Sequence, residues 1–94
     1  MSGAGFAGTG VAALDHEILA EKAAALGRVG ERAEVCLRQL LDHRGEGRDG
    51  RIKQAADAVY AYFIQRELCG LRRHDDVIRE LAIPREVIVR LGAM

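Results

Sequence analysis

The densest group of side chains that could do chemistry lies between residues 65 and 76, near the end of a predicted helix. Six of its members could act together: Arg66, Glu67, Cys69, Arg72, Arg73 and His74. They could bind an anion, hold a metal ion between Cys69 and His74, or activate the thiol, because a reactive cysteine needs an electropositive and partly exposed setting. No second cysteine stands at Cys-x-x-Cys spacing, however. We therefore expect this cluster to be structural, with Arg66 and Glu67 tying the helix end to its neighbours.

Two carboxylates near the start of the chain are the other candidate metal ligands. Glu17 and Glu21 are four residues apart and so share one face of a helix. No Glu-x-x-His or His-Glu-x-x-His accompanies them, and no second acidic helix completes a ligand set. Residues 3–8 match Gly-x-Gly-x-x-Gly, but only two residues precede them, so the strand that a dinucleotide site needs is missing. With no catalytic triad, phosphate loop or zinc spacing either, we expect no enzymatic activity, no cofactor and no metal.

The segment Val77–Leu91 has the apolar spacing of a helix-turn-helix. In that motif the second helix reads bases with its N-terminal residues, which would be Arg85 and Glu86, with Arg90 further along. The match is imperfect, since Pro84 stands where the motif usually has Ser or Thr and the second helix is short. Acids nearly balance arginines in this region, which leaves little field to attract phosphates. Nucleic-acid binding is therefore the alternative interpretation, and we do not expect a nucleic-acid partner.

One long helix is predicted from about Ala12 to His43. It carries an apolar seam that recurs every seven residues: Leu19, Leu26, Ala33 and Leu40. Gly27 and Gly30 would each destabilise it by about 1 kcal/mol relative to alanine. They favour a kink or break, unless another helix approaches closely there. Because the seven-residue spacing keeps its phase across both glycines, we expect a continuous helix.

The rest of the chain predicts three further helices and no strand. A polar loop at 44–51 contains Asp49 as a plausible N-cap for a second helix, from about residue 50 to 69, which runs antiparallel to the first. Gly70 ends that helix, and a short third helix follows. Pro84 suits the first position of a short fourth helix, which Gly92 stops. We divide the chain into a flexible glycine-rich tail at 1–10 and a single helical domain at 11–94.

The two long helices differ in length, and this mismatch predicts association. A helix of about 30 residues spans roughly 45 Å, whereas one of about 18 residues spans roughly 27 Å. The second helix therefore cannot cover the whole seam of the first. We predict an all-α fold that forms a dimeric helical bundle, and a homodimer is the leading interpretation of the seam. The expected function is that of a self-associating protein-interaction module, whose partner beyond itself the residues do not identify.

Bulk properties place the chain among small globular proteins. It has 94 residues, of which 49% are hydrophobic, and its 14 basic and 14 acidic residues cancel. That balance directs it neither to nucleic acid nor to an anionic membrane. Two cysteines are too few for a disulfide scaffold, no apolar run approaches a membrane span, and the N-terminus does not resemble a signal peptide. We expect a cytoplasmic protein without a membrane partner.

The C-terminal part resembles a small all-helical bacterial family of unknown function. The resemblance rests on the run QRELCGL at 65–71 and on IPREV at 83–87, and it covers roughly residues 55–93. It implies a compact helical fold and self-association. It implies no activity and assigns no functional role to any residue.

Overall fold

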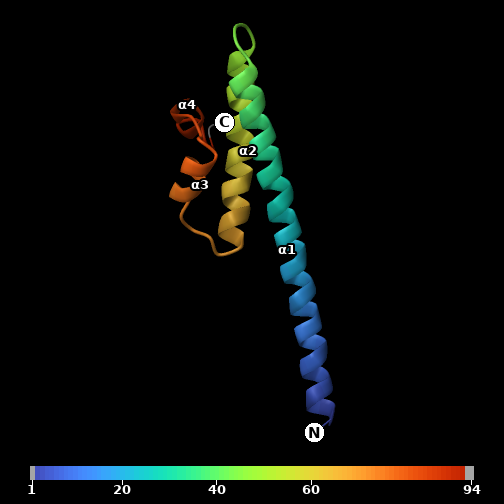
Figure 1. The fold of residues 1–94 in the computed structure, drawn as a ribbon. Coiled ribbons are helices and arrows are strands. Elements are labelled where there is room, and N and C mark those ends of the chain that lie inside the picture. The colour runs from blue at the N-terminus through green and yellow to red at the C-terminus, as the bar shows by residue number, and fades with distance from the viewer. Residues whose placement is uncertain (1, 93–94) are drawn as a thin grey trace.

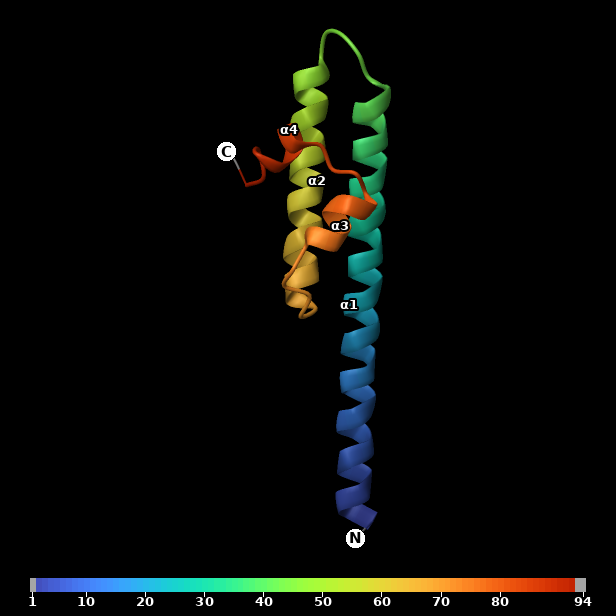
Figure 2. The same ribbon diagram turned by 60° about the vertical axis from the view of Figure 1, so that its left-hand side comes forward.

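The computed structural model describes the backbone of residues 2–92 and the side chains of residues 14–92. Over this range the chain forms four helices and no strand: α1 (Ser2–Asp42), α2 (Arg48–Leu68), α3 (Asp75–Glu80) and α4 (Arg85–Ile88). Helices α1 and α2 form an antiparallel hairpin, and α3 and α4 lie along the hairpin on one side (Figure 1 and Figure 2). The predicted all-α fold with a long first helix is confirmed.

Helix α1 begins earlier than predicted. Its first residue is Ser2 rather than Ala12, so helical backbone includes nearly all of the glycine-rich segment at 1–10. Each glycine in this segment weakens a helix by about 1 kcal/mol relative to alanine, but none of them interrupts α1. The predicted start is therefore wrong. The proposed division into a flexible tail and a domain at 11–94 concerns mobility and stays a prediction.

The glycines in the middle of α1 do not break it. The helix is continuous through Gly27 and Gly30, as the phase of the seam predicted. A Cβ atom at Gly30 would lie 3.1 Å from Cε1 of Tyr62 on α2, whereas one at Gly27 would meet nothing within 4 Å. Gly30 is thus a point where a large side chain of α2 lies close to the backbone of α1.

The connection between the long helices depends on glycine, and one predicted cap is wrong. Gly47 is the N-cap of α2 with φ of 82°, a left-handed conformation that glycine adopts without strain. No side chain caps this end. Asp49, the predicted N-cap, lies in the first turn of α2, and its carboxylate accepts a hydrogen bond from Arg90 at 2.7 Å instead.

Helices α2 and α3 end in the same way. After α2, the amide of Gly70 donates to the carbonyl of Glu67 and the amide of Leu71 donates to that of Arg66, the Schellman pattern. After α3, the corresponding bonds run from Ala82 to Arg79 and from Ile83 to Ile78. The left-handed residue is Gly70 (φ 87°) in the first case but Ala82 (φ 49°) in the second. Helix α3 therefore ends on a residue for which this conformation is sterically unfavourable.

The two short helices complete a core that α1 and α2 begin. Val77 of α3 and Val87 of α4 are buried, at 4% and 0% exposure, and Ile83 between them is buried as well. The C-terminal helix therefore belongs to the core. Helix α4 starts one residue later than expected, because Pro84 is its N-cap and not its first helical residue. The core consists of aliphatic and alanine side chains with one phenylalanine and one cysteine: Ala33, Cys36, Leu37, Leu40, Ile52, Ala55, Ala56, Ala58, Val59, Phe63, Val77, Ile83 and Val87.

Candidate interaction surface

The predicted seam of α1 divides into a covered half and an uncovered half. Ala33 and Leu40 are buried at 0% and 2% exposure in the core of the same chain. Leu26 is half-buried, and Leu19 is 64% exposed. The four predicted interaction residues therefore do not form one surface. Only Leu19 and part of Leu26 are accessible to a partner.

The uncovered half belongs to a long extension of α1 beyond the hairpin. Helix α2 ends at Leu68, and the N-terminal half of α1 continues past that end with no other helix beside it (Figure 1). Leu14 and Ile18 are exposed here at 61% and 53%, together with Leu19. We call residues 14–23 the overhang. A group of large aliphatic side chains exposed on one helix is typical of a surface that binds a partner.

The overhang is acidic and shows no sign of a metal site. Its charged residues are Asp15, Glu17, Glu21 and Lys22, which give a net charge of −2. All four are exposed. Among the residues whose side chains are described, no three His, Cys, Asp or Glu side chains gather as metal ligands would. Glu17 and Glu21 are both exposed on the surface of α1.

The polar cluster at the end of α2 is built around a buried arginine. Arg66 is 8% exposed, and its Nε donates to Nδ1 of His74 at 3.1 Å. Its Nη2 donates to the carbonyl of Arg73 at 2.9 Å and lies 3.6 Å from a carboxylate oxygen of Asp76. The guanidinium also lies over the ring of Tyr62, 5.8 Å from its centre. These contacts tie the end of α2 to the segment that precedes α3, as predicted for Arg66.

The hydrogen bond from Arg66 also determines which tautomer the neutral ring of His74 adopts. A guanidinium can only donate, so Nδ1 of His74 must accept, and the ring hydrogen of the neutral imidazole is on Nε2. Nε2 lies 3.0 Å from a carboxylate oxygen of Glu67 and donates to it. The ring stacks on Phe63 with centroids 4.1 Å apart and planes 6° apart. Both ring nitrogens are thus occupied, and neither is free to bind a ligand.

The remaining members of the predicted cluster stand apart from this network. Arg72 and Arg73 are exposed, and Arg73 contributes only its backbone carbonyl. Cys69 is a half-buried free thiol at the C-cap of α2. The structure therefore joins Arg66, Glu67 and His74 in one hydrogen-bonded network, and the thiol of Cys69 is not part of it.

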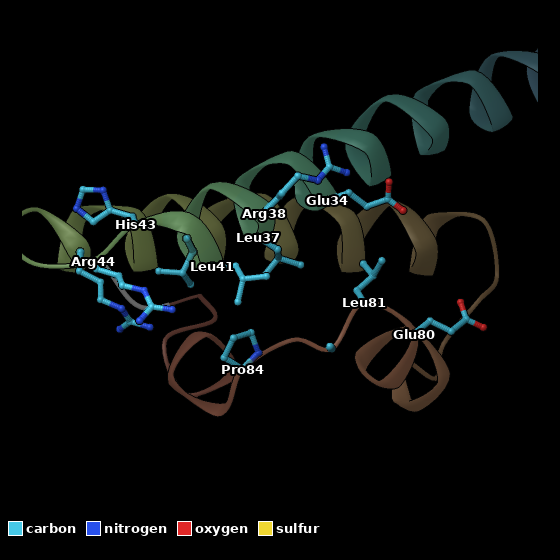
Figure 3. Close-up of a pocket in the computed structure, with 12 residues that line it drawn as sticks. Glu34, Leu37, Arg38, Leu41, His43, Arg44, Glu80, Leu81 and Pro84 are labelled. Carbon is cyan, nitrogen blue, oxygen red and sulfur yellow. The ribbon is translucent and has the colours of Figure 1, made fainter.

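A groove that the sequence did not predict runs between α1 and the turn from α3 to α4 (Figure 3). Its volume is about 720 Å³. Leucines and the residues of the turn line its apolar part: Leu37, Leu40, Leu41, Leu81, Ala82 and Pro84. Charged or polar side chains surround it: Glu34, Arg38, His43, Arg44, Arg48 and Glu80. No local sequence signal marks this groove, because its two walls are about 40 residues apart in the chain.

The segment considered as a helix-turn-helix is held to α2 by two ion pairs. Arg48 donates two hydrogen bonds to Glu86, at 2.8 and 2.5 Å, and Arg90 donates to Asp49 at 2.7 Å. These hydrogen bonds hold the pKa of Glu86 below its ordinary 4.5 and that of Asp49 below its ordinary 3.8. Two of the three residues expected to read bases therefore contact α2, and only Arg85 is left exposed without such a pair in the described structure.

Comparison with known proteins identifies a family but no activity. In the described part of the chain, no helix is both long enough and apolar enough to cross a membrane. No curated protein and no solved structure matches the chain. A family described as "Family of unknown function (DUF6665)" matches residues 4–94. Because that match spans nearly the whole chain, this protein belongs to DUF6665, a family of unknown function, as the C-terminal resemblance predicted.

Proposed function

We propose that this protein is a self-associating helical module, without catalytic activity of its own, that forms a homodimer through the overhang of α1. The observation that carries the proposal is the exposure of Leu14, Ile18 and Leu19, each more than half accessible, on the part of α1 that no other described helix covers. A second copy of the chain would supply the missing cover.

The composition of α1 supports the need for a partner. An isolated helix in water is marginal even when it is rich in alanine, and most helices in proteins are stabilised by packing of an apolar face. The N-terminal part of α1 also contains Gly3, Gly5, Gly8 and Gly10, each of which weakens a helix by about 1 kcal/mol. Packing against a partner would offset this cost, because burial of one large aliphatic side chain contributes roughly 1.5–3 kcal/mol.

A second copy is the simplest partner. Most soluble oligomers are homo-oligomers, and twofold dimers are the commonest among them. In a twofold dimer the same surface is buried on both chains, so forming the dimer covers the overhangs of both. The two free thiols, Cys36 and Cys69, are consistent with a reducing compartment, and we propose a cytoplasmic protein on that basis.

Light scattering of the purified chain at micromolar concentration tests the proposal. We expect a mass near twice the chain mass of 10.2 kDa. The variant Leu19→Glu should be a monomer with an unchanged core, since Leu19 is exposed in the single chain and a charge there disturbs no internal packing. Val89→Glu is the matched control, because Val89 is similarly exposed at 66% but lies beyond α4. A wild-type protein that stays monomeric would refute the proposal.

A further inference from the structure

The groove and the overhang lie on the same side of α1. Leu19 in the overhang and Leu41 in the groove are 22 residues apart, which is about six turns at 3.6 residues per turn. Both side chains therefore project in nearly the same direction from one straight helix. They are also among the most exposed apolar residues described, at 64% and 76%. A single chain cannot join them, because the helix itself holds them roughly 33 Å apart.

We propose that the overhang of one copy seats in the groove of a second copy, with the two α1 helices antiparallel. The contact occurs twice in the dimer, since the second copy returns its own overhang to the groove of the first. This inference rests on the proposed self-association and adds the surface of the partner that each overhang occupies. It explains why the groove, formed by α1 and the α3–α4 turn, is open in the single chain.

The apolar surfaces match in size and kind. The groove presents Leu41 toward the space beside Pro84, with Leu37 and Leu81 further along it (Figure 3). Leu19 is a side chain of the same kind on a helix with no cover. Seating it against Leu41 would remove from water two leucines that are each more than half exposed in the isolated chain.

The charges match in register as well as in sign. If Leu19 lies against Leu41 of an antiparallel partner, then Asp15, one turn before Leu19, lies level with the segment just after α1 of that partner, where Arg44 lines the groove. Arg44 lies two residues beyond the end of α1 at Asp42. Neither Asp15 nor Arg44 forms an ion pair within the described part of the chain.

The wider charge balance favours the same pairing. The overhang has a net charge of −2, from three acids and Lys22. The groove has three arginines and two glutamates around it, a net charge of +1 with His43 neutral. Complementary charge of this kind fixes orientation and register in an interface more than it adds affinity. An antiparallel arrangement therefore brings opposite charges together at both ends of the dimer.

The experiment compares variants on the two surfaces by sedimentation equilibrium of the full chain. Leu41→Glu should raise the dimer dissociation constant by roughly a hundredfold, because a leucine contact is lost at two places in each dimer. Asp15→Arg and Arg44→Asp should each raise it by a few-fold to about tenfold, and the double variant should recover most of the loss. Arg72→Asp, which reverses an exposed charge away from the groove, is the control.

Mixing gives a second and independent readout. In an equimolar mixture of Leu19→Glu and Leu41→Glu chains, the heterodimer keeps one contact with both leucines intact, whereas each homodimer has none. We therefore expect heterodimers to form where neither variant dimerises alone. If Leu41→Glu dimerises like the wild type while Leu19→Glu is monomeric, the groove assignment is overturned and self-association through the overhang stands. If neither variant changes the dimer, both proposals are overturned.

Discussion

Arg66 is the residue on which the packing of the C-terminal region depends most directly. It is the one charged side chain that is buried among the described residues, and a buried cation is costly unless its donors are matched. His74 accepts from Nε, the carbonyl of Arg73 accepts from Nη2, and Asp76 supplies the nearest opposite charge. The sequence therefore uses one arginine to position the chain between α2 and α3.

Replacing His74 tests how far the stability of the C-terminal region depends on the contacts of Arg66. His74→Phe keeps an aromatic ring on Phe63 but leaves the Nε hydrogen of Arg66 without an acceptor, so we expect a loss of about 1–3 kcal/mol in the free energy of unfolding. The double variant with Arg66→Met removes the unpaired donor as well and should be less destabilised than His74→Phe alone. Urea denaturation at one protein concentration measures all the variants. If the double variant loses as much stability as His74→Phe alone, or as much as the two single variants added together, the hydrogen bond between Arg66 and His74 contributes little.

Ala82 offers a gain in stability. It holds a left-handed φ of 49° at the end of α3, in the position that Gly70 occupies after α2. For an alanine that conformation costs roughly 1–2 kcal/mol. Glycine avoids this cost, but it destabilises the folded protein by about 0.4–1 kcal/mol because its unfolded state has more conformational freedom. Ala82→Gly should therefore stabilise the protein by about 0.5–1 kcal/mol. Thermal unfolding checks this, with Ala82→Val, a β-branched side chain, as the destabilised control.

The ion pairs between α2 and α4 make the docking of α4 sensitive to acid. Hydrogen bonds from Arg48 hold the pKa of Glu86 below 4.5, and those from Arg90 hold the pKa of Asp49 below 3.8. The unfolded chain therefore takes up these protons first as the pH falls. The pairs contribute their full stability above the unfolded values and lose it progressively as the pH falls toward the lowered folded values. Both pairs are exposed, so the contribution is modest.

Glu86→Gln tests this coupling. The variant should lose a small amount of stability at pH 7 and should show a shallower fall in stability between about pH 4.5 and pH 3 than the wild type. Glu46→Gln, a change in the exposed loop between α1 and α2, is the control. Urea midpoints measured across this pH range give the comparison. An acid slope as steep in Glu86→Gln as in the wild type would mean that other carboxylates govern the acid sensitivity.

The local sequence pattern predicted where the helices lie along the chain, but it did not predict the contacts at their ends. Ile52, Ala56, Val59 and Phe63 of α2 recur at helical spacing and are all buried, because periodicity records which face of a helix meets the core. Asp49 is not the N-cap of α2, because the helix begins before it, at Arg48, and its carboxylate accepts a hydrogen bond from Arg90, 41 residues away. The stack of His74 on Phe63 escaped prediction for a related reason, since it depends on how the chain folds back after Gly70.

The candidate surface was predicted only in half. A mismatch of helix lengths predicted an uncovered seam, and Leu19 is on it. Sequence spacing could not tell that Ala33 and Leu40 are covered by α2 of the same chain, because that depends on where the hairpin turns. The groove beside Leu41 was missed altogether, since Pro84 comes to it from the other end of the sequence.

The shape of the whole molecule reflects the unequal lengths of α1 and α2. A compact chain of this length has a radius of gyration of about 12 Å. The radius of gyration of this protein is 18.3 Å, with principal extents of 69 × 25 × 19 Å. The long dimension follows α1, whose N-terminal half projects from an otherwise small helical core (Figure 2). A single chain of this shape leaves much of its longest helix without tertiary support.

Association should therefore appear in the thermal stability of the whole protein. If the folded form is a dimer and the unfolded form is a single chain, mass action raises the melting temperature with concentration. From the average unfolding entropy per residue, a tenfold increase should raise the melting temperature by about 3–4 °C. Differential scanning calorimetry between roughly 10 and 100 μM would detect a shift of this size. Leu19→Glu should melt at a temperature independent of concentration and near that of the dilute wild type, because its fold is intact and only the contact is lost. A wild-type melting temperature that stays constant over this range would mean that the overhang of α1 is exposed in the native protein.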